Sequence, residues 1–129
     1  MTLCPCQSNK EYIACCQVYL EDKQAAKTPE ALMRSRYTAY TLARIDYIAA
    51  TQLAPAADHF DLDSAEKWAK KCKWLGLTVH RAWLDEKNPS RGYVEFTAHF
   101  KMNGKKEKIH EVSEFNRQNQ CWYYVRGVQ

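Results

Sequence analysis

Residues 4–16 of the chain read CPCQSNKEYIACC and contain four of its six cysteines, namely Cys4, Cys6, Cys15 and Cys16. Four thiolates brought together by a short loop are the ligands of a closed tetrahedral zinc site. The N-terminal segment of residues 1–18, which we call the knuckle, has few apolar side chains and cannot form a core of its own. Bound Zn²⁺ would therefore supply its folding energy. The spacing predicts a structural zinc ion that has no open position for catalysis.

Two other interpretations of these cysteines stay open. They could form disulfides, for example Cys4 with Cys15 and Cys6 with Cys16, or they could be unrelated or reactive thiols. Residues 1–16 are polar and lack the apolar stretch of a signal peptide, so we expect a cytoplasmic protein. Thiols in that compartment are kept reduced, which favours a metal site over disulfides.

The composition is that of an ordinary globular domain with a small appendage. The chain has 129 residues, of which 46% are hydrophobic and 26% charged, and its apolar runs are too short to span a bilayer. The formal net charge is +4, and four thiolates around Zn²⁺ would lower it further. This balance is too mild to indicate nucleic-acid binding. Lysines concentrate in residues 63–81 and 101–108, which form either a basic patch for RNA, a ribosome or an acidic protein, or ordinary solvated surfaces.

A strong helix start follows the knuckle at Thr28-Pro29-Glu30, where a hydroxyl cap precedes proline and an acid in the first turn. From Ala31 to about Gln52 the chain contains no glycine or proline. Apolar residues recur there at helical spacing: Met33, Tyr37, Tyr40, Tyr47 and Ile48. The pattern predicts one long helix that ends before Pro55.

A second helix is expected from Asp63, with Glu66 in the capping-box position and Gly76 as its stop. On this prediction Trp68, Cys72 and Leu75 stack along one face and make Cys72 a core residue.

Beyond Gly76 the hydrophobic period changes from that of a helix to two, which is typical of strands. Strands are predicted over residues 75–83, 93–102, 106–117 and 121–126. Asn103-Gly104 is a strong hairpin signal between the second and third. Two helices followed by four antiparallel strands predict an α+β fold in which a curved sheet packs on the helices.

The stretch CPCQSNKEYIACC resembles the SEC-C motif, a zinc-binding module also found at the C-terminus of the translocation ATPase SecA. The usual pattern of the motif is Cys-Pro-Cys-Gly-Ser-Gly-Lys-x-Tyr-x-x-Cys-Cys/His. The four cysteines stand at its ligand positions, and the scaffold positions are matched by Pro5, Ser8, Lys10 and Tyr12. Gln7 and Asn9 replace the two glycines. Asparagine tolerates a positive φ well and glutamine less so, which makes Gln7 the larger departure.

Further stretches are similar to YchJ-like bacterial proteins: LMRSRY (32–37), Tyr40, Asp46-Tyr47, HEVSEF (110–115), WYYV (122–125) and Gly127. This resemblance covers nearly the whole chain. It implies a SEC-C knuckle followed by a nuclear-transport-factor-two-like domain, which is a cone of curved antiparallel sheet closed on one side by helices. We therefore expect a zinc knuckle with its linker over residues 1–24 and the α+β domain over residues 25–129.

Domains of this fold often hold a pocket between the sheet and the long helix. The candidate pocket residues here are Arg36, Tyr37, Glu111, Ser113 and Phe115. Glu111 and Ser113 share a strand face because they are two residues apart. Arg36 and Glu111 would either bind a polar ligand or form a structural ion pair between helix and sheet, and we prefer the ion pair.

Two functions are consistent with these features. The favoured one is a zinc-binding adaptor whose knuckle docks onto a protein or ribosomal partner. The alternative is a small-molecule binding protein or enzyme that uses a pocket inside the cone. The sequence contains no phosphate loop, dinucleotide fingerprint or nucleophile–base motif, which favours a binding protein over an enzyme.

Overall fold

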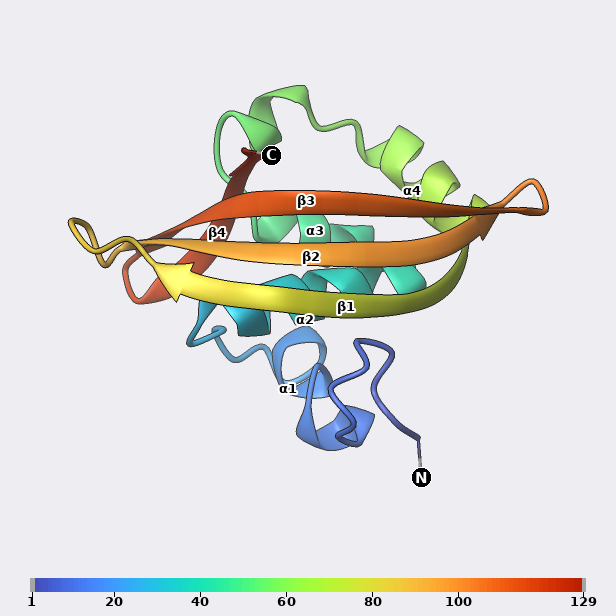
Figure 1. Cartoon of the computed structure of the whole chain (residues 1–129), viewed down its shortest axis with the longest axis horizontal. Coiled ribbons are helices and arrows are strands. Elements are labelled where there is room, and N and C mark those ends of the chain that lie inside the picture. The colour runs from blue at the N-terminus through green and yellow to red at the C-terminus, as the bar shows by residue number, and fades with distance from the viewer. Residues whose placement is uncertain (1, 129) are drawn as a thin grey trace.

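A curved antiparallel sheet with the strand order β1-β2-β3-β4 runs the length of the molecule (Figure 1). The structure is a computed structural model and describes residues 2–128. The strands are β1 (Lys73–Leu84), β2 (Arg91–Met102), β3 (Lys105–Gln118) and β4 (Cys121–Gly127). Asn103 and Gly104 join β2 to β3 with φ angles of 54° and 78°, as a type I′ hairpin turn requires.

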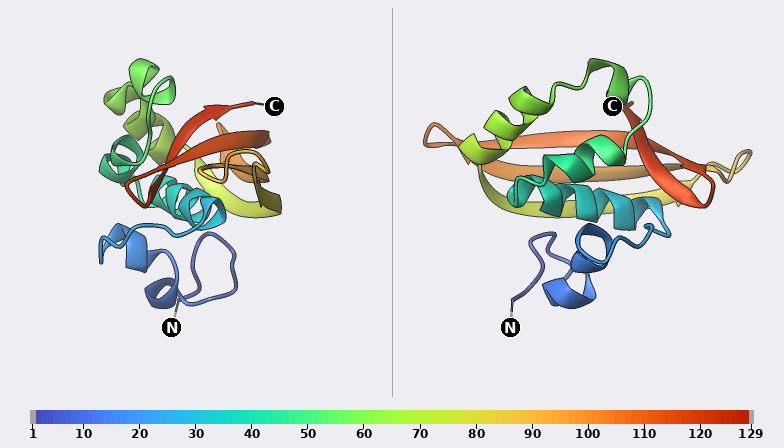
Figure 2. Two further views of the ribbon diagram at one scale, coloured as in Figure 1. Left: turned by 90° about the vertical axis from the view of Figure 1, so that its left-hand side faces the viewer. Right: turned by 180° about the vertical axis from the view of Figure 1, so that it is seen from behind.

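The helices lie on one side of this sheet (Figure 2), and the buried strand face toward them is mainly apolar. Val94, Phe96, Ala98 and Phe100 alternate along β2 and are all buried, which confirms the predicted period of two. Phe115 on β3 is fully buried in the same layer. The predicted α+β fold class, a small N-terminal cysteine segment before a curved antiparallel sheet on helices, is confirmed.

The predicted long helix is broken in two, so this prediction was wrong. Helix α2 (Pro29–Thr41) begins as expected, because the Thr28 hydroxyl accepts a hydrogen bond from the Ala31 N–H at 3.0 Å. A short helix, α3 (Ile45–Ala50), follows after a turn.

A Schellman motif ends α2. The N–H of Arg44 donates to the carbonyl of Ala39, and the N–H of Ala43 donates to that of Tyr40. Ala43 has a φ of 55° and occupies the position that glycine usually fills in this motif. Since the residue there is alanine, the sequence carries no signal for the break.

Helix α4 (Leu62–Lys71) begins two residues earlier than predicted. Its cap is Asp61, whose carboxylate accepts a hydrogen bond from the Ser64 N–H at 3.2 Å, and not Asp63. Asp63 lies in the first turn, where its charge favours the helix dipole.

The predicted end of this helix at Gly76 was also wrong. Lys71 is the last residue of α4, and Gly76 lies inside β1 at a register shift against β2. Cys72 is buried but follows the helix, and Leu75 is 39% exposed on the strand, so the predicted stacking with Trp68 does not occur.

The knuckle and the following residues pack beneath α2 (Figures 1 and 2). Their short helical turns are η1 (Tyr12–Ala14) and α1 (Gln17–Leu20), and a third short turn, η2 (Ala56–His59), precedes α4. Cys4, Cys6 and Cys16 are buried in the same cluster as Leu32 and Tyr37 of α2. The knuckle therefore shares a core with the rest of the molecule. No helix in residues 2–128 is both long and apolar enough to cross a membrane.

Candidate metal centre and cone cavity

The sulfur atoms of Cys4, Cys6, Cys15 and Cys16 lie within 4.8 Å of one another. Two of the separations are 3.6 Å, between Cys6 and Cys15, and 4.0 Å, between Cys15 and Cys16. A regular tetrahedron with zinc–sulfur bonds of about 2.3 Å has edges of about 3.8 Å. The cluster therefore has the donor set and the dimensions of a tetrahedral thiolate site.

The backbone of the knuckle folds so that all four sulfurs point inward. Gln7 and Asn9 both adopt a left-handed conformation, with φ angles of 63° and 71°. These are the two glycine positions of the SEC-C pattern, and in this chain non-glycine residues adopt the left-handed conformation there. None of the cysteines forms a disulfide within residues 2–128, and sulfur separations near 4 Å exceed the S–S bond length of about 2.05 Å.

Hydroxyl groups contact the sulfurs from outside the cluster. Thr38 on α2 is fully buried, and its hydroxyl donates to the Cys16 sulfur at 3.3 Å and lies 3.7 Å from the Cys4 sulfur. The Ser8 hydroxyl lies 3.2 Å from the Cys15 sulfur. Groups of this kind orient metal ligands and reduce the negative charge on thiolates.

The thiols compete for negative charge when no cation balances them. Hydrogen bonds from Cys16 and Cys6 hold the pKa of the Cys4 thiol far below its ordinary value. The same contact with Cys4 raises the pKa of the Cys16 thiol. Four thiolates at these distances therefore need a cation, and a divalent ion would stabilise all of them together.

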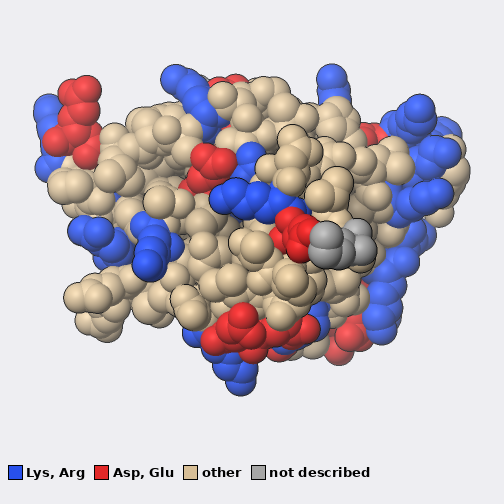
Figure 3. Space-filling view, turned by 90° about the horizontal axis from the view of Figure 1, so that it is seen from below, with Lys and Arg blue, Asp and Glu red and all other residues tan. Residues whose placement is uncertain are grey.

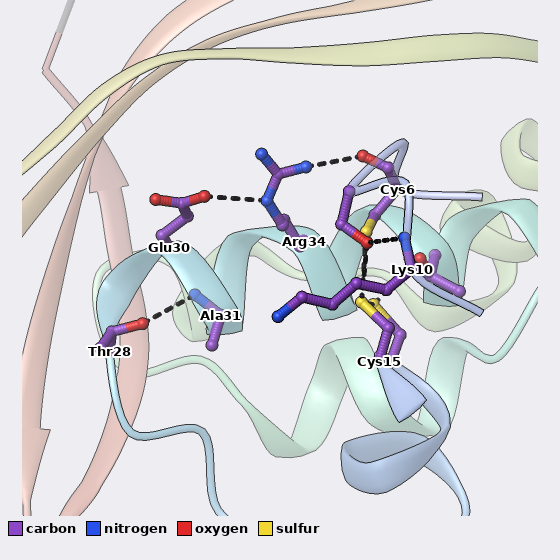
Figure 4. Close-up of polar contacts among 10 residues, drawn as sticks. Cys6, Lys10, Cys15, Thr28, Glu30, Ala31 and Arg34 are labelled. Carbon is purple, nitrogen blue, oxygen red and sulfur yellow. Dashed lines mark hydrogen bonds and ion pairs between the residues drawn. The ribbon is translucent and has the colours of Figure 1, made fainter. Parts of the chain in front are cut away.

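Arg34 fastens the knuckle to α2 (Figure 4). Its Nη1 donates to the carbonyl of Cys6 at 2.8 Å, and its Nε donates to the Glu30 carboxylate at 2.9 Å. The guanidinium thus holds the backbone of one cysteine of the cluster against α2.

A cavity of about 180 Å³ lies between the helices and the inner face of the sheet. Four of the five predicted pocket residues line it: Arg36, Tyr37, Glu111 and Ser113. Phe115 belongs to the core instead. Sequence reasoning missed Tyr40, Trp68, Trp74 and Tyr124, which also line the cavity. Their aromatic character was visible in the sequence, but it also fits an ordinary core.

The preferred ion pair between Arg36 and Glu111 is not formed within the described residues. Arg36 instead donates to the carbonyl of Ile48, the hydroxyl of Thr51 and the amide oxygen of Gln52 at 2.8–3.2 Å. These three acceptors stand at the end of α3, which the helix break brings back beside α2. Burial lowers the pKa of the Arg36 guanidinium.

Glu111 is held by neighbours on the sheet. Its carboxylate accepts hydrogen bonds from the Ser113 hydroxyl and, at 3.3 Å, from the Tyr124 hydroxyl. Burial, followed by the charge of Glu111, raises the pKa of Tyr124. The guanidinium of Arg36 lies 4.7 Å from the centre of the Tyr124 ring, so Tyr124 contacts both charged groups.

The two lysine-rich segments meet in the fold. Lys101 pairs across the sheet with Lys73 on one side and Lys106 on the other. Figure 3 shows Lys and Arg gathered at one end of the molecule, on the side where Figure 1 places the β2–β3 turn. Elsewhere on that face positive and negative side chains are mixed.

Comparison with known proteins gives consistent matches. Residues 28–127 match the family model described as "YchJ, middle NTF2-like domain". The chain is 44% identical over 129 residues to a UPF0225 protein of Chromobacterium violaceum, and the match covers 97% of this chain and 91% of the relative.

Two solved structures are similar along nearly the whole chain. One is the solution structure of a SEC-C motif containing protein from Rhodopseudomonas palustris, with a TM-score of 0.87, 39% identity and coverage of 98% of this chain and 97% of that one. The other is the crystal structure of a SEC-C motif containing protein from Psychrobacter arcticus. It has a TM-score of 0.81, 33% identity and coverage of 95% and 80%.

Proposed function

The chain belongs to the YchJ-like family of SEC-C motif proteins, as its sequence predicted, and we propose that it is a zinc-stabilised binding protein. In this proposal Cys4, Cys6, Cys15 and Cys16 hold one structural Zn²⁺ and the knuckle docks onto a protein or ribosomal partner in the cytoplasm. The proposal is carried by the sulfur cluster, in which all four atoms lie within 4.8 Å of one another and two separations, 3.6 and 4.0 Å, are close to the edge of a zinc tetrahedron.

The ion would act on the fold and not on a substrate. Four thiolates complete its coordination, so no position is left for water or a reactant. In this proposal the knuckle with its linker, residues 1–24, and the α+β domain, residues 25–129, form two units that pack against each other. The sheet and helices α2 and α3 contribute most of the core, so we expect residues 25–129 to stay folded when zinc is removed.

Metal analysis of the reduced protein tests the zinc site. We expect about one zinc per chain, and loss of that zinc in the Cys15→Ser, Cys16→Ser double variant. Cys121→Ser serves as the control, because Cys121 lies outside the cluster, on β4. The proposal would be contradicted if the double variant retained zinc, or if the unaltered chain contained none.

Docking by the knuckle is supported by two exposed apolar side chains. Leu3 is 61% exposed and Ile13 is 63% exposed, although both belong to a segment that is otherwise organised around buried sulfurs. Large apolar residues on a rigid surface are typical of interaction sites.

Binding to purified ribosomes, and cross-linking in cells that produce the protein, test this docking. We expect the Leu3→Ser, Ile13→Ser double variant to lose its partner while it keeps zinc. Leu84→Ser is the matched control, since Leu84 is 48% exposed at the end of β1, away from the knuckle. Equal recovery of partners by both variants would show that the knuckle does not take part in the interaction.

A second function, the binding of a small molecule inside the cone, is supported by a separate observation. The cavity between α2 and the sheet contains Arg36 and Glu111 without an ion pair between them. Charged groups left available in a largely apolar cavity are typical of ligand sites.

A further inference from the structure

The cavity has walls of interlocked aromatic rings. Trp68 packs edge to face against Trp74 at 5.1 Å and against Tyr40 at 5.6 Å, and Trp74 packs in the same way against Tyr37 at 5.8 Å. Such contacts fix the rings and hold the space open. An apolar cavity of about 150 Å³ accommodates one benzene molecule. At about 180 Å³, this cavity has room for one ring with a small substituent.

Hydrogen-bonding capacity remains on Arg36 and Glu111, which both line the cavity and both contact Tyr124. Arg36 has five N–H groups, of which three donate to acceptors at the end of α3. The other two have no acceptor among residues 2–128. On Glu111, Oε2 accepts both hydrogen bonds of that carboxylate, and Oε1 accepts none from the described residues. A donor and an acceptor are therefore both available.

The charges of Arg36 and Glu111 determine which net charge a ligand of the cavity can carry. Arg36 and Glu111 are the charged residues that line the cavity in the described part of the chain, and they balance each other. An anion would be repelled by Glu111, and a cation would be repelled by Arg36. A hydroxyl group can accept from Arg36 and donate to Glu111 at the same time.

We infer that the cavity binds a neutral molecule of one-ring size, with an apolar body between Tyr40, Trp68 and Trp74 and one hydroxyl group held by Arg36 and Glu111. This inference rests on the second proposed function and names its ligand class. The aromatic walls supply most of the contact area, and the two charged groups supply the orientation.

Four probes with the same ring separate the ligand classes: toluene, benzyl alcohol, benzylammonium and benzoate. Each is titrated into the full-length, zinc-loaded chain, and the indole N–H signals of Trp68 and Trp74 are followed by NMR. Those of Trp83 and Trp122, which do not line the cavity, are internal controls. We expect benzyl alcohol to bind about tenfold more tightly than each of the other three, which is the value of a hydrogen bond to a charged group.

The outcomes distinguish the inference from the function on which it rests. If none of the probes shifts the signals of Trp68 and Trp74, both the second function and the ligand class are wrong. If toluene or a charged probe binds as tightly as benzyl alcohol, the cavity binds small molecules but the ligand class is wrong.

Two variants test the placement of the ligand. Ala98→Leu fills the cavity from β2 and should abolish binding, whereas Ala49→Leu makes the same change at an exposed position of α3 and should leave binding unchanged. Glu111→Gln keeps the shape of the side chain and leaves Arg36 unopposed. This variant should prefer benzoate to benzyl alcohol, and an unchanged preference would overturn the role of Glu111.

Discussion

The side-chain oxygen of Gln7 accepts a hydrogen bond from the backbone N–H of Leu77 at 3.0 Å. Gln7 is the knuckle residue that replaces a motif glycine in a left-handed conformation, and Leu77 is buried on β1. A Cβ atom on Gly76 would lie 2.6 Å from this side-chain oxygen, so glycine at 76 makes room for the contact. Gln7 therefore adopts a backbone conformation that is unfavourable for glutamine, and its side chain attaches the knuckle to the sheet.

We expect Gly76→Ala and Gln7→Ala each to destabilise the protein, because both disturb this contact. At residue 76 the φ of 158° adds backbone strain for alanine. The added methyl group displaces the Gln7 side chain, which costs about 1–3 kcal/mol. Removal of the Gln7 amide leaves the Leu77 N–H without its partner at a cost of about 1–3 kcal/mol. Urea unfolding of the zinc-loaded protein measures both free energies.

The double variant is the decisive member of this series. Once Gln7 is alanine, the methyl group at residue 76 has no glutamine side chain to displace. The loss of unfolding free energy in the double variant should therefore be smaller than the sum of the losses in the two single variants. Full additivity would mean that residues 7 and 76 act independently.

The hydroxyl of Thr38 should set the affinity of the proposed zinc site. Thr38→Val keeps the shape of the side chain but removes the donor to the Cys16 sulfur. We expect zinc to bind about 10–100-fold more weakly, as is usual when an outer contact of a metal ligand is lost. Competition with a chromophoric chelator measures the affinity.

Thr38→Ser is the control, because it retains the hydroxyl and loses a methyl group from a fully buried position. This variant should lose stability and keep most of its zinc affinity. If the serine and valine variants bind zinc equally, the hydroxyl has no effect on the metal.

Ala43→Gly should stabilise the protein. Ala43 has a φ of 55° in the Schellman motif that ends α2, a conformation that costs a residue with a Cβ about 1–2 kcal/mol. Glycine adopts it freely, so we expect a gain of about 1 kcal/mol in the free energy of unfolding, measured in urea. The same substitution at Ala49, an exposed residue within α3, should instead lower stability by about 0.5–1 kcal/mol. Equal effects at both positions would contradict the assigned helix break.

Tyr37 should contribute to unfolding at alkaline pH. Burial raises the pKa of Tyr37 from 10.0 to about 12. Between these values the unfolded chain releases a proton that the folded chain retains. The stability contribution of the neutral phenol is therefore complete below pH 10 and is lost as the pH rises toward 12.

The Tyr37→Phe variant isolates this effect and keeps the ring that packs on Trp74. From pH 10 to 12 the unaltered protein should lose stability faster than the variant by about 1.4 kcal/mol per pH unit, in urea unfolding at a series of pH values. Parallel curves for the two proteins would show that another group causes the alkaline loss.

Local patterns predicted the elements whose signals lie in neighbouring residues. The structure confirms the predicted Thr28 cap, the alternation along β2 and the Asn103-Gly104 turn. Capping, strand period and turn conformation each depend on a few consecutive residues. The end of α2 was missed, because the Schellman motif has alanine where glycine is its usual signal.

The sequence by itself determined the family, the α+β class and the cysteine set, since one short loop is enough to bring four thiols within thirteen residues together. Only the tertiary structure decided where the charged groups of the cone find their partners. Arg36 donates three hydrogen bonds to acceptors at the end of α3, and Glu111 accepts from its neighbours on β3 and β4, so the expected ion pair is absent within residues 2–128. The physical reason is distance along the chain: the cavity is formed by residues from 33 to 124, and their packing depends on helix breaks and strand curvature that no short stretch encodes.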